Sequence, residues 1–468
     1  MKKNDKVIIL GSILLIYTIL TWFIGGGVYT NGVYNSTGIE RLGIFDLFLF
    51  VCQAFYIKAV DIFYLLSIGG FYGFASRTKS YRKIVTKVCE LIEGREHIAM
   101  LVITLLMGLY TSITNNILSL VFITPFIITV YLRRGCDRLT AISAAFGGIF
   151  IGFLGQTFGS YGYTNLLSAA SITIKSGMLI KVLMFVVSYI LYNVFAIMHM
   201  NSRIKNPEYV KFDMFAINEV DESKVKPSLR KKIWPTVLLY CLSLIVILLA
   251  YINWQTSFNV ELFSNILKKV QEWELFNTTV LSSLLGNFTA FGNWDIIGIT
   301  FILVLVTLIM AISNKISLSD VIDSYGIGIK KISKVVFVYV LIHSLFVAYY
   351  TSNWPMAIVH SLLGTEFNIF GIFLGSVIHG ATVIDLDYAT YYIGGAIATN
   401  YVDNLLDSAL LIHMGYALVN VIAPTSSILM IALSYLNVPY SKWLKYIWKF
   451  VAIMALICLV MIAFSAYA

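Results

Sequence analysis

The stretch that decides the fold is NLLDSALLIHMGYALVNVIAPTSSILMIALSYLN, residues 404–437. It is as apolar as a membrane-spanning helix but longer than the about 20 residues that one span needs. Pro424 interrupts it near the middle, because proline lacks a backbone donor and clashes with the preceding helical turn. Thr425 and Ser426 follow directly and can cap a new half-helix. The stretch therefore predicts a helix that is broken inside a membrane.

The composition of the whole chain agrees with a membrane protein. Of the 468 residues, 59% are hydrophobic and 12% are charged, whereas a typical soluble domain is about 45–50% apolar and about 25% charged. These values exclude a disordered protein, a soluble enzyme and a nucleic-acid-binding module. The net charge of +9 does not indicate nucleic acid, because Lys and Arg cluster at the ends of apolar runs. The five scattered cysteines form neither a disulfide framework nor a zinc site.

Apolar runs of two lengths divide the chain. Seven runs fit single spans, at residues 7–24, 59–76, 179–199, 233–252, 295–312, 335–352 and 447–467. Four more are too long for one span or carry a polar interruption, at residues 97–132, 138–172, 367–400 and 404–437. These four segments are the ones expected to contain hairpins or broken helices.

The basic residues predict the orientation of these segments. Clusters of Lys and Arg should face the cytoplasm, and they occur at 77–96, 133–138, 201–232, 330–334 and 442–449. Segments 25–40 and 353–366 are nearly free of basic residues and should face outward, which places the N-terminus in the cytoplasm. Segment 97–132 then begins and ends inside, so it is expected to be a re-entrant hairpin. Segment 367–400 is expected to be a second hairpin that opens outward.

The two halves then read alike in opposite orientation. Each half reads span, surface segment, hairpin, broken span and span, which is the signature of an inverted repeat. The predicted fold class is an all-α polytopic membrane protein with the inverted-repeat fold of secondary transporters, two re-entrant hairpins and two broken helices. The predicted organisation is a first transmembrane helix and outer loop at 1–58, repeat one at 59–200, a cytoplasmic loop with linking scaffold helices at 201–334, and repeat two at 335–468.

The two breaks are the first candidate binding elements. Broken backbone in a membrane is tolerated where it lines a cavity or binds a ligand. The first break contributes Gln156, Thr157 and Ser160 among three glycines, and the second contributes Thr425 and Ser426 with Asn420 one turn earlier. Half-helix N-termini favour a carboxylate, and unwound carbonyls favour a cation such as Na⁺. The alternative is an ordinary kink whose hydroxyls only bond to the freed backbone.

The two hairpin tips complete the predicted substrate site. The inner tip is polar and uncharged, and its candidates are Ser112, Thr114, Asn115 and Asn116. The outer tip contributes Thr382 and the carboxylates Asp385 and Asp387, which are functional candidates if they lie inside the membrane and simply solvated if they reach the headgroups. His379 and His413 are more typical of hydrogen-bonded structural histidines than of a proton relay.

Several motifs of the chain resemble those of the YfcC-like carriers, a family of anaerobic C4-dicarboxylate carriers in the ion transporter superfamily. The similar stretches are Gly43–Asp46 with Ile68–Gly73, Gly135–Thr140 with Gly152–Gly155, Pro424–Ser426 with Leu429 and Met430, and Val438–Lys445. They follow the family's order over most of the chain. The resemblance implies an elevator-type secondary carrier, in which a transport domain holds the hairpins and broken helices and a scaffold dimerises.

The chain departs from the family pattern at the presumed site. Ala423 stands where the family has Asn, and Gln156 replaces a Ser of the first break, where Gly159 and Ser160 stand in place of Asn-Pro. Thr114 and Asn115 occupy the positions of an acidic pair at the inner tip. Asp385 and Asp387 appear at an outer tip that is rich in Ser and Gly in the family. The two carboxylates would attract a cationic group, so the sequence favours an amino acid or related metabolite, with a C4-dicarboxylate as the alternative.

These features predict a secondary transporter of a small polar metabolite in a bacterial cytoplasmic membrane. No ATP-binding motif occurs, so transport is expected to use an ion gradient or exchange, with Na⁺ or H⁺ as the coupling ion and no cofactor. An enzyme is not expected, because neither HExxH nor Gly-x-Ser-x-Gly is present. A passive channel or degenerate transporter relative is the remaining alternative. The expected partners are the substrate, the lipid bilayer and a second copy of the chain, with no nucleic acid.

Overall fold

The computed structural model of the chain describes residues 5–30, 32–159, 167–168, 171–216, 234–274, 279–286, 288–382, 393–394 and 396–467. The chain forms two compact units. The large unit comprises Met1–Ile62, Val85–Ala216 and Lys330–Ala468, and the small unit comprises Phe63–Ile84 and Ile217–Ile329. These two units are defined by which parts of the chain pack together. The four segments predicted from the sequence are defined by membrane topology instead, so their boundaries remain a prediction.

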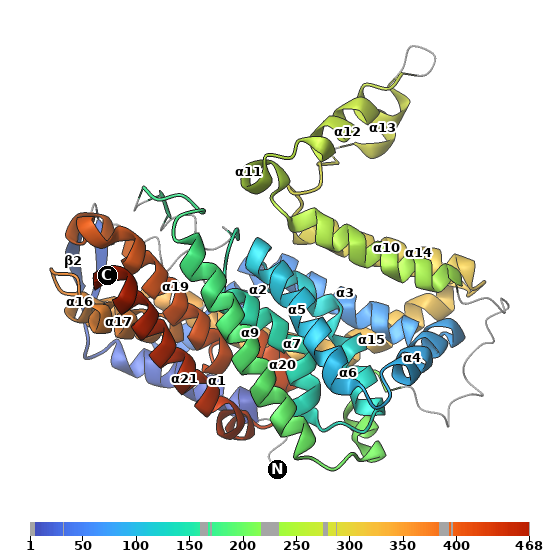
Figure 1. Cartoon of the computed structure of the whole chain (residues 1–468), viewed down its shortest axis with the longest axis horizontal. Coiled ribbons are helices and arrows are strands. Elements are labelled where there is room, and N and C mark those ends of the chain that lie inside the picture. Colours follow the sequence, from blue (N-terminus) through green and yellow to red (C-terminus); the bar gives the residue numbers. More distant parts are fainter. Residues whose placement is uncertain are drawn as a thin grey trace. The chain divides into compact units, whose positions relative to one another are not determined.

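Nearly all described elements are helices (Figure 1). The large unit contains α1 (Asp5–Leu20), β1 (Gly26–Thr30), β2 (Val33–Gly38), α2 (Ile44–Ile57), α5 (Glu96–Thr114), η1 (Ser119–Phe122), α6 (Thr124–Arg133), α7 (Arg138–Leu154), α9 (Met178–Asn201), η2 (Pro207–Phe212), α16 (Trp354–Leu363), α17 (Ile369–Thr382), η4 (Val402–Asn404), α19 (Leu405–Ile422), α20 (Ser427–Tyr435) and α21 (Tyr440–Tyr467). The small unit contains α10 (Trp234–Tyr251), α11 (Trp254–Phe258), α12 (Leu262–Gln271), α13 (Val280–Leu285) and α14 (Ile296–Ser313). Helices α3 (Ala59–Ala75), α4 (Lys79–Leu91) and α15 (Leu318–Thr351) run through both units.

Seven helical runs within the described residues are long and apolar enough to cross a membrane. They are α5, α9, α10, α14, α15, α21 and the run Val402–Tyr435, which holds both halves of a broken helix. Helices α2 and α3 would make an eighth span together, although they meet at an angle of 72°. The predicted spans at 179–199, 233–252 and 295–312 agree with α9, α10 and α14 to within two residues.

The structure differs from the predicted spans at three places. Helix α1 ends at Leu20, ahead of three consecutive glycines at Gly25–Gly27, and is shorter than the predicted span 7–24. Helix α2 and the antiparallel hairpin of β1 and β2 occupy a region read as an outer loop. Helix α15 begins at Leu318, ahead of the predicted span 335–352, because no proline lies between the two and the helix continues through Gly326 and Gly328.

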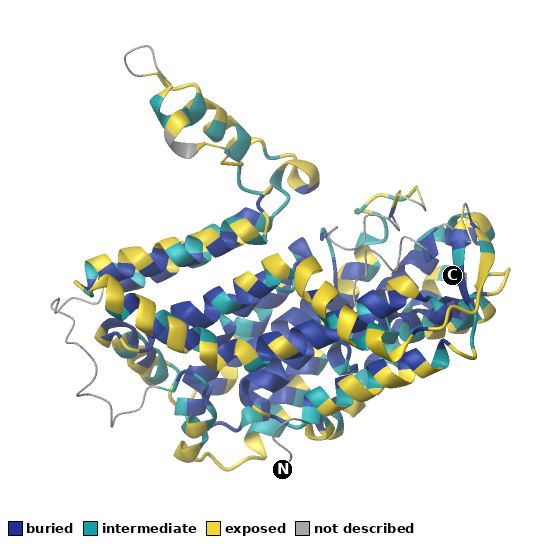
Figure 2. Cartoon of the chain, turned by 180° about the vertical axis from the view of Figure 1, so that it is seen from behind, coloured by how far each residue is buried: buried dark blue, intermediate teal, exposed yellow. Residues whose placement is uncertain are grey.

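The broken helices form the core of the large unit. Every residue of α7 from Leu139 to Leu154 is buried, and so is every residue of α20. A helix that is apolar on all sides must be covered on all sides. Helices α7, α19 and α20 accordingly contribute to the buried residues, which are drawn dark blue in Figure 2. Helices α9 and α21 pack beside them and keep one apolar face exposed, as expected for helices that face lipid.

Small residues let each hairpin arm approach a broken helix closely. Helix α5 packs along α7, where a methyl group on Gly152 would overlap the carbonyl of Gly108. Helix α17 packs along α19 in the same way, where a methyl group on Gly415 would overlap the hydroxyl of Ser376. The same arrangement therefore occurs once in each half of the chain.

Side-chain hydrogen bonds and a close helix crossing hold the small unit together. The hydroxyls of Tyr72 and Tyr240 are 2.7 Å apart, and Ser80 donates to the side-chain oxygen of Asn314 at 3.1 Å. Helices α3 and α15 cross at glycines, and a methyl group on Gly328 would overlap the carbonyl of Gly69. Helices α10 and α14 lie side by side (Figure 1).

The glycine crossing predicts a stability difference between two neighbouring positions of α15. Gly328→Ala should destabilise the protein by about 1–3 kcal/mol, because the added methyl group forces backbone apart. Gly326→Ala is the matched control, since nothing lies within 4 Å of its added Cβ, and helix propensity alone should stabilise it by about 0.5–1 kcal/mol. Thermal unfolding in detergent measures both. Equal unfolding temperatures of the two variants would contradict a close backbone contact at Gly328.

Candidate functional site

The two ends of the predicted inner hairpin lie together. Arg134, directly after α6, forms an ion pair of 3.1 Å with Glu96 at the start of α5, and Tyr131 donates to the carbonyl of Glu96 at 2.9 Å. Lys205 adds a second ion pair to Glu96 at 2.6 Å. The start of α5 and the end of α6 are thus adjacent, so the chain leaves this ion-pair cluster through α5 and returns to it through α6.

The tip of this hairpin packs on the first break. The hydroxyl of Ser112 donates to the carbonyl of Gly155 at 2.5 Å and lies 2.9 Å from the hydroxyl of Thr157. The carbonyl of Ser112 accepts from the backbone N–H groups of Thr157 and Gly159, at 2.9 and 3.3 Å. Two predicted site elements, the inner tip and the first break, are therefore in contact, because the backbone groups freed at the end of α7 bond to the tip.

The other tip residues shape the turn. Asn115 ends α5 in the left-handed conformation, with a φ of 55°, and a methyl group on Gly159 would crowd its backbone. Thr114 donates to the carbonyl of Tyr110 at 2.9 Å, and the side-chain oxygen of Asn116 accepts from the N–H groups of Leu118 and Ser119. Thr114 and Asn116 therefore hold the turn itself.

Gln156 has an unusual position in the first break. Its side chain is 2% exposed, yet neither amide atom has a hydrogen-bond partner within the described part of the chain. A buried amide without partners costs free energy comparable to that of lost hydrogen bonds. Gln156 is therefore the predicted residue that is best prepared to bond to a ligand.

The second break is closed mainly by side chains. Ser426 caps α20 through the N–H of Leu429 and donates to the carbonyl of Asn420 at 2.8 Å. The predicted cap is confirmed. Trp443 and Tyr440 of α21 donate to the carbonyls of Val421 and Ile422, at 2.9 and 2.7 Å. The freed carbonyls at the end of α19 thus find partners on a neighbouring helix.

Two predicted residues at the second break differ in their bonding. The amide of Asn420 donates to the carbonyl of Tyr416 at 3.0 Å and so remains tied to its own helix. Thr425 is buried, and its hydroxyl has no partner among the residues that the structure describes. Thr425 therefore resembles Gln156 in offering an unused polar group next to broken backbone.

A direct bond links the two broken helices. His413 of α19 lies 2.8 Å, through Nε2, from the carbonyl of Phe153, two residues before the first break. The inner end of α7 is joined to the end of α20 through Arg138, which donates to the carbonyls of Leu436 and Asn437. Asp137 caps α7 there. Burial alone would raise the pKa of this carboxyl, but hydrogen bonds from His199 and Thr140 outweigh it and lower the pKa to about 2.

Lys181 is a candidate residue that the sequence analysis did not single out. Its side chain is buried on α9, and its ammonium donates at 2.7 Å to the carbonyl of Ile174. No carboxylate forms an ion pair with it in the described ranges. Phe185, one turn along the same helix, packs against Gly155. The sequence feature that could have identified Lys181 is its position as a single lysine inside an apolar run.

His379 is enclosed by two tyrosines. Its Nε2 lies 2.5 Å from the hydroxyl of Tyr349, and its Nδ1 is hydrogen-bonded to the hydroxyl of Tyr416. Thr382, near the end of α17, donates to the carbonyl of His379 at 2.8 Å and so bonds within its own helix. Three predicted site residues, Ser160, Asp385 and Asp387, lie outside the described residues.

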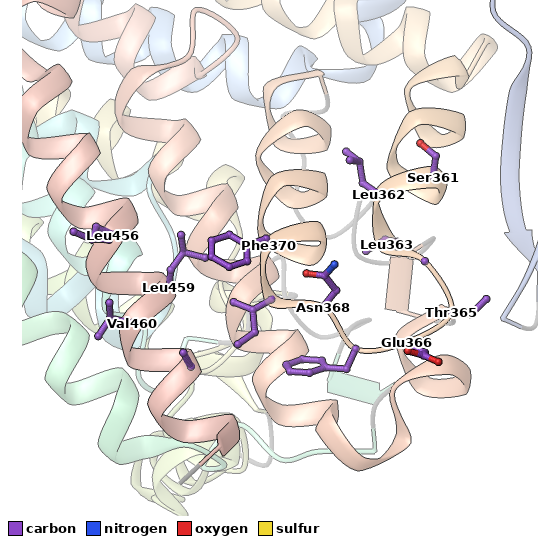
Figure 3. Close-up of a pocket in the computed structure, with 14 residues that line it drawn as sticks. Ser361, Leu362, Leu363, Thr365, Glu366, Asn368, Phe370, Leu456, Leu459 and Val460 are labelled. Atoms are coloured by element: carbon purple, nitrogen blue, oxygen red, sulfur yellow. The ribbon is translucent and has the colours of Figure 1, made fainter.

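A cavity of about 700 Å³ lies away from both breaks (Figure 3). It is lined by the turn between α16 and α17, including Glu366 and Asn368, and by Leu456 and Val460 of α21. None of the predicted site residues lines it, and its α21 wall belongs to an exposed apolar face. The described residues contain no group of three or more His, Cys, Asp or Glu side chains that could hold a metal.

The contact between tip and break predicts a stability loss on truncation. Ser112→Ala should destabilise the protein by about 1–3 kcal/mol, because it leaves the buried carbonyl of Gly155 without this donor. Ser333→Ala is the control, since Ser333 is exposed and its hydroxyl bonds only to the carbonyl of Lys330 in its own helix. Thermal unfolding compares the two. Equal stability of the two variants would show that the tip does not depend on this bond.

Comparisons with known proteins find similar structures and a family. The crystal structure of the Alcanivorax borkumensis YdaH transporter is 13% identical, with 98% of this chain and 99% of that chain covered and a TM-score of 0.41. The Neisseria gonorrhoeae protein MtrF, described among antimetabolite efflux pumps, is 14% identical, with coverage of 97% and 93% and a TM-score of 0.34. No curated protein sequence matches the chain.

The sequence profile of the DcuC family, the C4-dicarboxylate anaerobic carriers, matches residues 4–349 and 409–467. The match confirms the family expected from the motifs. The family match agrees with the long apolar helices, and both indicate a multi-pass membrane protein. The chain belongs to the C4-dicarboxylate anaerobic carrier family, a family of transporters.

Proposed function

We propose that this protein is a secondary carrier of a small organic anion of the C4-dicarboxylate class, driven by an ion gradient or by exchange. The observation that carries the proposal is the buried ammonium of Lys181, which has a carbonyl but no carboxylate as its partner among the described residues. The family to which the chain belongs supports the same class of substrate.

The energetics of Lys181 favour an anionic ligand. A buried charge is costly unless an opposite charge and hydrogen bonds compensate it. A substrate carboxylate beside Lys181 would supply that charge. The unpartnered amide of Gln156 belongs to the break against which α9 packs, and it could donate to the same substrate. The described tip and break carry no carboxylate that would repel a dicarboxylate.

The proposed mechanism is that of an elevator carrier with an inverted repeat. Its support is the packing of α5 on α7 and of α17 on α19, which pairs a hairpin arm with a broken helix in each half. The ion pair between Glu96 and Arg134 supports a re-entrant inner hairpin, because both of its ends lie at one level. We propose that these elements move together and that the remaining helices form a scaffold that dimerises.

The proposed location is a bacterial cytoplasmic membrane with the N-terminus inside. It is supported by the basic clusters between the apolar runs. No cofactor is required, and the coupling ion is H⁺ or Na⁺. The sequence feature that favours an amino acid as a second candidate is the pair Asp385 and Asp387, which would attract an ammonium group.

Removing the charge of Lys181 should weaken transport of the anion. A hydrogen bond to a charged group contributes about 1.5–3 kcal/mol, so Lys181→Met should raise the KM for succinate about 10- to 100-fold. The measurement is uptake of radiolabelled succinate by proteoliposomes. Lys181→Arg keeps the charge and should recover part of the affinity.

Lys175→Met is the matched control, because Lys175 is exposed six residues earlier in the chain. It should transport succinate with an unchanged KM. A wild-type protein that takes up an amino acid but no dicarboxylate, or a Lys181→Met variant with normal uptake, would contradict the proposal.

A further inference from the structure

We infer that His379, held between Tyr349 and Tyr416, is the group that binds and releases the coupling proton of this carrier. The inference rests on the proposed transport function and adds to it the identity of the coupling ion and its site. It assigns a use to a buried titratable side chain that the anion site does not employ.

The geometry places both ring nitrogens against hydroxyls. His379 lies on α17 and is fully buried. Its Nε2 faces Tyr349 of α15 at 2.5 Å, and its Nδ1 faces Tyr416 of α19. Both tyrosines are 1% exposed. The site is thus buried among three helices.

Other titratable groups on the neighbouring helices have other partners. In the described part of the chain, only the two tyrosines are hydrogen-bonded to the ring of His379. His360 of α16 is bonded to Tyr29, and His343 of α15 is bonded to the carbonyl of Tyr339. On α19, Asp407 is bonded to Ser465 and His413 to the carbonyl of Phe153. Lys334 of α15 is bonded to Asn437, and Asp320 of α15 to Ser317. No described carboxylate forms an ion pair with His379. A charge on this ring would therefore need a compensating anion.

Two hydroxyl partners let the ring exist in either protonation state. A neutral imidazole has one N–H and one bare nitrogen, so one tyrosine accepts from the ring and the other donates to it. The imidazolium has two N–H groups, so both tyrosines accept and the former donor turns its O–H to another acceptor. In hydrogen bonding, proton uptake therefore requires the rotation of one hydroxyl, in addition to the cost of burying the charge. A backbone carbonyl, which can only accept, would not allow the neutral ring to receive a bond at that nitrogen.

The triad is connected to the second break. Tyr416 lies one helical turn before Asn420, whose amide donates to the carbonyl of Tyr416 at 3.0 Å. Asn420 in turn accepts from Ser426, which caps the second half-helix. Gly380, next to His379, allows α17 to approach the ring of Tyr416, since an added Cβ would lie 3.2 Å from it. A change at His379 is therefore passed to the broken helix through a few bonds.

Charge compensation explains why the proton and the anion would move together. A buried imidazolium is unfavourable by itself, and a dicarboxylate bound to the same carrier would add the compensating negative charge. Each ligand then raises the affinity for the other by the same factor, as linkage requires. The proton enters from water with the anion on one side and leaves to water on the other, and no covalent bond changes.

The test separates coupling from transport. Proteoliposomes are assayed for accumulation of labelled succinate driven by an inward proton gradient, and for exchange of labelled against unlabelled succinate at equal pH. His379→Gln should lower gradient-driven accumulation at least tenfold and lower exchange less than threefold, and its exchange should no longer vary with pH. Tyr349→Phe, which keeps the ring and its packing, should shift the pH profile of exchange and covers the case in which the glutamine variant does not fold.

The matched control is His343→Gln, a buried histidine of α15 whose ring bonds to the carbonyl of Tyr339 at 2.9 Å. It should keep both accumulation and exchange. Wild-type exchange without a response to the proton gradient, or accumulation driven by Na⁺ alone, would overturn the inference and leave the proposed function intact. Absence of succinate exchange by the wild type would overturn the proposed function and the inference with it.

Discussion

The structure of the large unit depends on one constraint, which is that backbone groups freed inside two buried helices must bond to protein. Neither lipid nor bulk water can satisfy them at that depth. At the first break, the hairpin tip supplies the partner, since Ser112 bonds to the carbonyl of Gly155. At the second, α21 supplies it, since Trp443 bonds to the carbonyl of Val421. The hydrogen bonds needed by the freed donors and acceptors therefore determine which elements pack against each broken helix, as much as apolar packing does.

The same constraint explains why polar groups left over at the breaks are informative. Most hydroxyls and amides near the breaks are used to close them, as Ser426 does. Gln156 and Thr425 are buried beside the closed backbone with no partner in the described ranges. The ammonium of Lys181, buried on the helix that packs against Gly155, is a third polar group near the first break, with the carbonyl of Ile174 as its partner. The arrangement suits a ligand that binds by many short polar contacts.

Local signals made the breaks and most helices predictable from the sequence. Pro424 ends one helix by its own chemistry, and the polar tip at 111–116 stands out in an apolar run. Features that depend on distant contacts were not predictable in this way. Helix α2 meets α3 at 72° without a proline or glycine at the joint. Lys181 lies within the predicted span 179–199, and its burial and carbonyl partner depend on the folded chain.

The bonds that join the broken helices to each other and to α21 bear on where the free-energy barrier of a transport cycle would lie. Arg138 joins α7 to the end of α20, Ser143 lies 2.8 Å from the hydroxyl of Tyr446, and His413 reaches the carbonyl of Phe153. Two of these contacts join the two broken helices, and the third joins α7 to α21. In the proposed elevator mechanism, the cross-linked helices, α21 included, would move as a stiff block, and the barrier to turnover would lie where that block slides against its surroundings. Substitutions inside the block would change how tightly cargo is held, and substitutions at its edge would change how fast it travels.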